Sequence, residues 1–204
     1  MNTDAEVWKR HFPTATSGAH LFPEFEMRAK AVSGEVFRVP DAAEARETLI
    51  RLMDGVGAKK AVVVESPLQE AAGITEALRS LGVTVYTEPA DIAAHAETAD
   101  IGISGVEFGI AETGSVFQDG GAIATRLVTI LPPLHVVFMP SANIVPRITE
   151  AFDIISQSFD RGYVGFITGP SRTADIERVL TIGVHGPSRF AIIAVDETPK
   201  GGEA

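Results

Sequence analysis

Two kinds of hydrophobic pattern alternate along the first half of the chain. Short apolar runs, such as residues 61–64, predict strands that are buried on both faces of a sheet. Between such runs, apolar residues recur every three or four positions over residues 45–53 and 71–81, and this spacing predicts helices. Strands that alternate with helices indicate an α/β fold, with a mostly parallel sheet flanked by helices.

Capping signals mark where two of these helices begin. Asp41 is followed three residues later by Glu44, and Ser66 by Gln69, which is the spacing of a capping box. Pro67 occupies the first helical position, where its missing N–H group is no loss. We therefore predict one helix after Asp41 and another that runs from Ser66 to residue 81.

The second half of the chain does not keep this alternation of strand and helix patterns. Apolar and small or polar residues alternate over residues 106–110, and turn residues flank residues 115–117, so we predict a small antiparallel excursion. The further predicted elements are strands at 127–131 and 135–139, a helix opened by Pro146, a strand at 164–167, a helix after Thr173 and a last strand at 190–195.

The two ends of the chain lack a clear period. We expect residues 1–33 to form an irregular arm that docks on the domain or on a second subunit, residues 34–197 to form the α/β domain, and residues 198–204 to be a disordered tail. The first residues lack the charged and apolar pattern of a signal peptide. No apolar run approaches the roughly 20 residues that a membrane span needs.

Composition narrows the classes of partner. The chain has 17 basic and 27 acidic residues, and its net charge of −10 disfavours binding to nucleic acid. It has no cysteine, which excludes disulfides, thiolate metal sites and cysteine-held iron–sulfur clusters within this chain and fits the cytoplasm. Its five histidines lack the spacing of metal ligands, so we predict no metal site.

Glycines and a carboxylate in residues 102–115 form the first candidate site. Gly105 and Gly114 can let a ligand approach the backbone, Thr113 borders the turn, and Glu112 can act as a base or a nucleophile. The alternative is that Glu112 accepts hydrogen bonds from backbone N–H groups while Thr113 and Gly114 reverse the chain. The residues alone favour this second interpretation.

The second candidate is the loop that contains Gly169, Ser171, Arg172 and Thr173. Backbone N–H groups at a helix start attract anions, and Arg172 can add a bidentate contact with a carboxylate or phosphate. Two acidic residues follow closely, so a small carboxylate ligand fits better than a polyphosphate. Equally, Thr173 can simply cap the helix.

The third candidate is His185, which lies between glycines in the stretch 183–187. Such a histidine can transfer protons near neutral pH, or it can hold the loop by bonding a carbonyl group. Motifs for a dinucleotide, for nucleotide phosphates and for a serine nucleophile are absent from the sequence.

Four stretches together resemble the LUD-domain family, in its lactate utilisation protein C branch. They occur in the family's order, and the resemblance covers roughly residues 36–195. The stretches are GISGVEFGIAETGS, RLVTILPPLHVVFM, GPSRTADIE and GVHGP.

This resemblance implies a fold related to sugar-phosphate isomerases and CoA transferases. It also implies a cytoplasmic role in the oxidation of L-lactate to pyruvate, together with partner proteins that carry iron–sulfur clusters. By position, Glu112 is similar to the nucleophilic glutamate of CoA transferases, which is an analogy at the level of the fold.

Three hypotheses follow from the residues and the resemblance. The chain is a subunit of a lactate-oxidising system, a CoA-transferase-like or phosphosugar-type enzyme that uses Glu112, or a non-catalytic binding module. We expect the residues Glu112, Arg172 and His185 to converge on one hollow if the site is catalytic.

Overall fold

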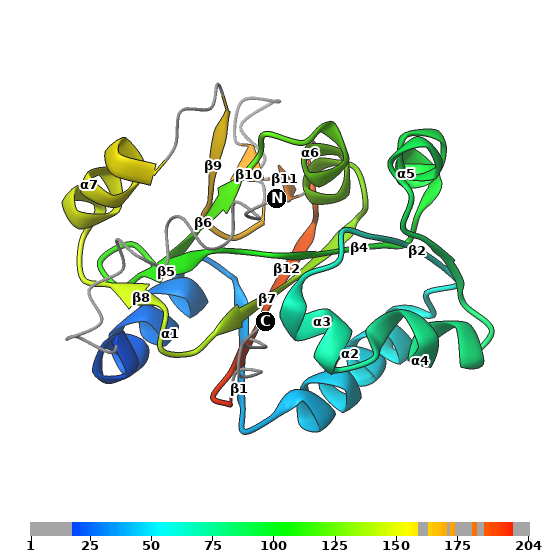
Figure 1. The fold of residues 1–204 in the computed structure, drawn as a ribbon, viewed down its shortest axis with the longest axis horizontal. Helices are drawn as coiled ribbons and strands as arrows, with labels where there is room; N and C mark the ends of the chain where they lie inside the picture. Colours follow the sequence, from blue (N-terminus) through cyan, green and yellow to red (C-terminus); the bar gives the residue numbers. More distant parts are fainter. Residues whose placement is uncertain (1–17, 159–162, 171, 174–180, 183–185, 198–204) are drawn as a thin grey trace, which may run out of the picture.

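Six parallel strands form the main sheet of the computed structural model, which describes residues 18–158, 163–170, 172–173, 181–182 and 186–197 (Figure 1). Their order across the sheet is β1-β12-β7-β4-β2-β3. The strands in that order are β1 (Glu35–Val39), β12 (Arg189–Val195), β7 (Leu134–Pro140), β4 (Ile101–Gly105), β2 (Lys60–Val63) and β3 (Thr84–Tyr86). The α/β class and the parallel sheet predicted from the sequence are thus confirmed.

Helices cover both faces of this sheet. On one face, α2 (Ala42–Val56), α3 (Pro67–Ala71) and α4 (Ile74–Ser80) bury their apolar sides against alternate residues of the strands. On the opposite face, α5 (Pro89–His95) and α6 (Ile123–Ile130) pack over β2 and β4. Figure 1 shows the first group below the sheet and the second above it.

A second sheet extends from the carboxyl ends of the central strands. It contains the antiparallel excursion that the sequence predicts. Its order is β8-β5-β6-β9, and its strands are β8 (Ile144–Val145), β5 (Phe108–Ile110), β6 (Ser115–Asp119) and β9 (Val164–Ile167). One face packs on the main sheet together with α1 (Phe22–Ala31), and the other face packs on α7 (Ile148–Ser158). The short elements are η3 (Gly18–Leu21), η4 (Ala96–Thr98), β10 (Arg172–Thr173) and β11 (Thr181–Ile182).

Three predictions from the sequence are wrong. Residues 127–131 belong to the end of helix α6 rather than to a strand. The helix predicted from Ser66 to residue 81 is divided into α3 and α4 at Gly73, whose φ of 60° is left-handed. Residues 18–31 form η3 and α1 instead of an irregular arm, because apolar residues recur on one face of α1 and enter the core between the sheets.

The predicted helix after Thr173 falls on residues 174–180, outside the described part of the chain, as do residues 1–17 and the tail 198–204.

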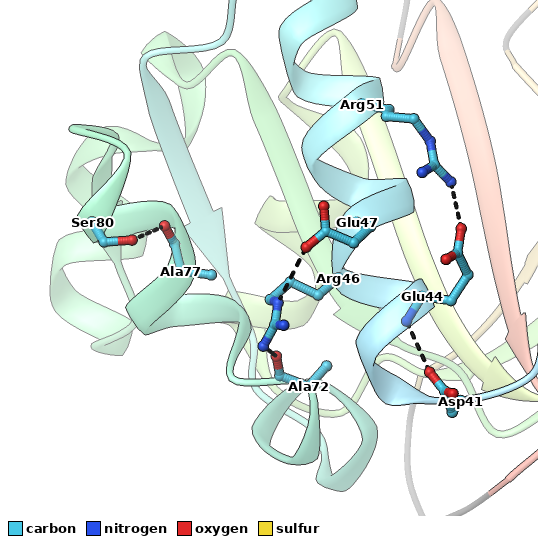
Figure 2. Close-up of polar contacts among 8 residues, drawn as sticks. All are labelled: Asp41, Glu44, Arg46, Glu47, Arg51, Ala72, Ala77 and Ser80. Atoms are coloured by element: carbon cyan, nitrogen blue, oxygen red, sulfur yellow. Dashed lines mark hydrogen bonds and ion pairs between the residues drawn. The ribbon is translucent and has the colours of Figure 1, made fainter.

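The two predicted capping boxes behave differently. Asp41 Oδ1 accepts a hydrogen bond from Glu44 N at 2.9 Å and caps α2, as Figure 2 shows. Ser66 takes the N-cap position of α3, but its side chain makes no capping hydrogen bond. In the same view, Arg46 of α2 reaches the carbonyl of Ala72 at 3.4 Å and links α2 to the end of α3.

Close contact between α6 and β4 depends on Gly102. A Cβ atom at this position would lie 2.1 Å from the carbonyl oxygen of Val128 in α6, so the helix can rest on the strand only where no side chain intervenes. In the part of the chain that is described, no helix is long and apolar enough to cross a membrane.

We expect Gly102→Ala to lower the free energy of unfolding by about 3 kcal/mol, because the added methyl group must push α6 from the sheet. Gly55→Ala is the matched control, since nothing lies within 4 Å of the added Cβ and an alanine in α2 should stabilise the protein by up to about 1 kcal/mol. Urea unfolding measures both changes, and equal stabilities for the two variants would contradict the packing argument.

Candidate functional site

The topology of the main sheet places a switch point between β2 and β4. From β2 the chain moves outward to β3, then returns past β2 to β4 and continues in the other direction to β7 and β12. In open α/β sheets, ligands bind outside the carboxyl ends of the strands at such a point. Ser66 and Gly105 lie at these two strand ends, and Glu107 follows two residues after Gly105.

A buried network of hydrogen bonds begins at the end of β4. The Ser104 hydroxyl lies 2.9 Å from His135 Nε2, and Gln118 Nε2 donates to Ser104 Oγ and to the Gly105 carbonyl, both at 2.9 Å. Thr129 of α6 donates to Gln118 Oε1 at 2.7 Å. The network therefore joins β7, β4, β6 and α6 in a region where apolar residues otherwise predominate.

The hydrogen bonds of Ser104 favour one tautomer of His135. Ser104 Oγ accepts from Gln118 and still has its own proton to donate. When it donates that proton to His135 Nε2, the neutral imidazole carries its own proton on Nδ1. Burial lowers the pKa of His135 to about 3, so its imidazole is neutral near pH 7. His135 is thus an uncharged member of the network.

Glu107 brings a carboxyl group with an unusual protonation state to the same region. Its Oε2 accepts a hydrogen bond from Asp119 N at 2.9 Å, and the carboxyl lies in a buried environment although the residue as a whole is partly exposed. Desolvation raises the pKa of Glu107 to about 8 and outweighs the backbone hydrogen bonds that lower it. A carboxyl that keeps its proton near pH 7 can serve as a general acid or as a neutral hydrogen-bond donor.

The sequence-predicted residues Glu112, Thr113 and Gly114 lie elsewhere, in the turn between β5 and β6. Glu112 is exposed, and its Oε2 accepts from Ile148 N at the start of α7 at 3.1 Å. Thr113 Oγ1 accepts from Ser115 N within the turn at 3.3 Å. These contacts with backbone N–H groups are the kind expected of the alternative interpretation, although Glu112 caps α7 rather than its own turn.

Tight packing against the end of α1 explains two of the predicted glycines. Gly114 has a φ of 67°, and a Cβ there would lie 2.2 Å from Ala29 N. Gly169 has a φ of 75°, and its Cβ would lie 2.3 Å from the carbonyl oxygen of Val32. Both positions therefore require glycine for structural reasons.

The turn between β5 and β6 also meets the start of the second predicted loop. Ser115 Oγ and Thr168 Oγ1 are hydrogen-bonded at 2.7 Å. Arg172 and Thr173 lie in β10, which pairs antiparallel with β11, whereas Ser171 and His185 are outside the described residues. The shared hollow of Glu112, Arg172 and His185 therefore stays a prediction, and Gly105 belongs to the switch point instead.

Sequence reasoning missed the three residues His135, Gln118 and Glu107. A signal for the first was present, because His135 interrupts an apolar strand, and a polar group in such a strand needs a buried partner. The partners are separated along the chain, so the sequence does not identify them. Over the described ranges, no group of three histidine, aspartate or glutamate residues is arranged to hold a metal ion.

Comparison with known proteins gives a consistent match over most of the chain. The model of the LUD domain matches residues 22–195, which includes α1 and extends further toward the N-terminus than the resemblance noted in the sequence. Lactate utilization protein C of Anoxybacillus flavithermus is 34% identical over 159 residues, which are 77% of this chain and 72% of that protein. The protein of the same name from Bacillus subtilis is 41% identical over 107 residues, which are 50% and 45% of the two chains.

A solved structure supports the fold. A DUF162 family protein from Deinococcus radiodurans superimposes with a TM-score of 0.62 at 22% identity and covers 88% of this chain and 98% of its own. At this identity the likeness concerns the α/β architecture alone.

Stability should fall as the pH rises if Glu107 is protonated in the folded state. A carboxyl whose pKa rises from 4.5 to about 8 on folding contributes stability below about pH 4.5, and that contribution is lost as the pH rises through 8. The slope is at most about 1.4 kcal/mol per pH unit. We expect Glu107→Gln to remove this slope between about pH 5 and pH 8 in urea unfolding curves.

The control for this titration is Glu76→Gln, which makes the same chemical change at an exposed position of α4. It should keep the pH dependence of the wild type because Glu107 is intact. Identical pH profiles for the wild type and Glu107→Gln would show that Glu107 is ionised in the folded protein.

Proposed function

Because the chain belongs to the LUD-domain family, we propose that it acts in lactate utilisation, as a subunit of a cytoplasmic system that oxidises L-lactate to pyruvate. The observation that carries this proposal is the match with lactate utilization protein C of Anoxybacillus flavithermus across about three quarters of the chain. A further relative of that name, from a Geobacillus strain, is 32% identical over 169 residues, which are 76% of this chain and 70% of the relative.

Partner proteins that carry iron–sulfur clusters complete the proposed system. Conversion of L-lactate to pyruvate releases two electrons and two protons, so an electron acceptor is required. This chain has no cysteine with which to hold an iron–sulfur cluster in the usual way. We assign the electron transfer to the partners and the binding of the small carboxylate to this chain.

The geometry of Glu112 favours this role over the transferase alternative. Glu112 Oε2 accepts the N–H group of Ile148 at the start of α7, so this carboxylate has a capping role that accounts for its position without a reaction. The neutral hydrogen-bonding groups at the switch point support a ligand-binding role, because polar groups that converge in an apolar setting are typical of small-molecule sites.

Deletion of the gene should abolish growth on L-lactate and leave growth on glucose unchanged. Plasmid-borne wild type should restore growth on L-lactate. So should Glu112→Gln, because the loss of one charged cap costs at most about 1 kcal/mol of stability.

Growth rate in minimal medium with L-lactate as carbon source measures these outcomes. Normal growth of the deletion strain would contradict a role in lactate utilisation. Failure of a folded Glu112→Gln protein to restore growth would instead favour the transferase mechanism.

A further inference from the structure

Two polar side chains at the start of α3 are enclosed without hydrogen-bond partners. Among the described residues, Ser66 Oγ and both polar atoms of the Gln69 carboxamide have no hydrogen-bond partner. Gln69 is only 1% exposed, so bulk water does not satisfy the amide either. A buried polar group without a partner costs about 1–3 kcal/mol, and a native protein that retains one needs a reason.

Helix capping does not supply that reason. In a capping box, Ser66 Oγ would accept from Gln69 N, and the Gln69 side chain would accept from Ser66 N. Neither bond forms in α3, whereas the cap of α2 at Asp41 does form. The two side chains are therefore not used by the local backbone.

Ser66 lies at the switch point of the sheet, and Gln69 follows it three residues later in α3. Ser66 follows the end of β2 and faces the end of β4, where a Cβ on Gly105 would lie 2.9 Å from Ser66 Cβ and 3.2 Å from Ser66 Oγ. The carbonyl of Gly105 is already bonded to Gln118. Ser66 Oγ thus lies next to the buried network but outside it.

We propose that the Ser66 hydroxyl and the Gln69 carboxamide form a binding subsite for a small 2-hydroxycarboxylate, an inference that rests on the proposed function. The Ser66 O–H and Gln69 N–H groups donate to the carboxylate oxygens of the ligand, and Gln69 Oε1 accepts from a 2-hydroxyl group. Propionate and pyruvate have no hydroxyl proton to donate, so each leaves Gln69 Oε1 unpaired and binds more weakly than L-lactate.

The acidic side chains at these strand ends are compatible with an anionic ligand. Glu65 Oε1 accepts a hydrogen bond from the Thr75 hydroxyl at 2.8 Å. Glu107 is kept neutral near pH 7 by burial, as described above. Glu107 therefore adds no negative charge beside an anionic ligand near pH 7.

Access to the subsite requires α3 to move. The Gln69 amide is enclosed, and α3 has only five residues, bounded by Pro67 at its start and followed closely by Gly73. Its contact with Arg46 is a single long hydrogen bond of 3.4 Å to the Ala72 carbonyl. A ligand that bridges Ser66 and Gln69 should therefore slow amide hydrogen exchange across residues 68–72.

The test combines the stability of the free protein with ligand binding in Gln69→Leu. Leucine removes the unpaired amide at similar volume, so the free variant should melt at or above the temperature of the wild type. Calorimetric titration with L-lactate should show binding to the wild type and affinity at least about tenfold lower in the variant. Gln157→Leu, the same change at an exposed position of α7, should bind like the wild type.

Ser66→Ala provides a second, smaller change and should also weaken binding. Equal affinity of the wild type, Gln69→Leu and Ser66→Ala would overturn the subsite, and so would no binding of L-lactate at about 10 mM. A lower melting temperature of free Gln69→Leu would also overturn it, because the amide would then have a structural partner such as a buried water. None of these results decides the growth experiment, which tests the proposed function separately.

Discussion

The buried chain of hydrogen bonds from His135 through Ser104 and Gln118 to Thr129 is the constraint on which the rest of the structure depends. Each of these groups would cost stability if it were left unpaired in an apolar interior. Because its members come from β7, β4, β6 and α6, the network fixes where the second sheet and α6 lie on the main sheet. Gly102 allows this arrangement, since it lets the backbone of α6 approach β4.

Two glycine-rich regions of the molecule have different physical roles. Around the end of α1, Gly114 and Gly169 adopt left-handed conformations against the backbone, which accounts for these glycines without a ligand. At the switch point, Gly105 adjoins the buried network and the unpartnered hydroxyl of Ser66. In the second region, a glycine that leaves room beside the backbone lies close to a polar group without a hydrogen-bond partner. A binding site for a small molecule requires both features.

Much of the fold could be predicted because its signals are local. Residues 61–64 and 190–195 are apolar runs of strand length, and the Asp41 cap depends on residues three positions apart. Residues 127–131 could not be assigned in this way, because their β-branched side chains suit a strand and only the contact of α6 with the distant Gly102 shows the helix. The candidate site was harder to predict from the sequence than the fold. Burial of Glu107 and the pairing of His135 with Ser104 arise from segments that meet only in the folded chain.

The central claim is that the hydrogen-bond network at the end of β4 carries no charge and takes up no proton near pH 7. Nitrogen-15 NMR of the imidazole of His135, with His135→Gln to assign the signals, tests it most directly. The account predicts a neutral ring with its proton on Nδ1, unchanged as the pH falls from about 7 to about 5, since the pKa of His135 lies near 3. Protonation of His135 with a midpoint near its ordinary 6.5, or a neutral ring with its proton on Nε2, would contradict the account.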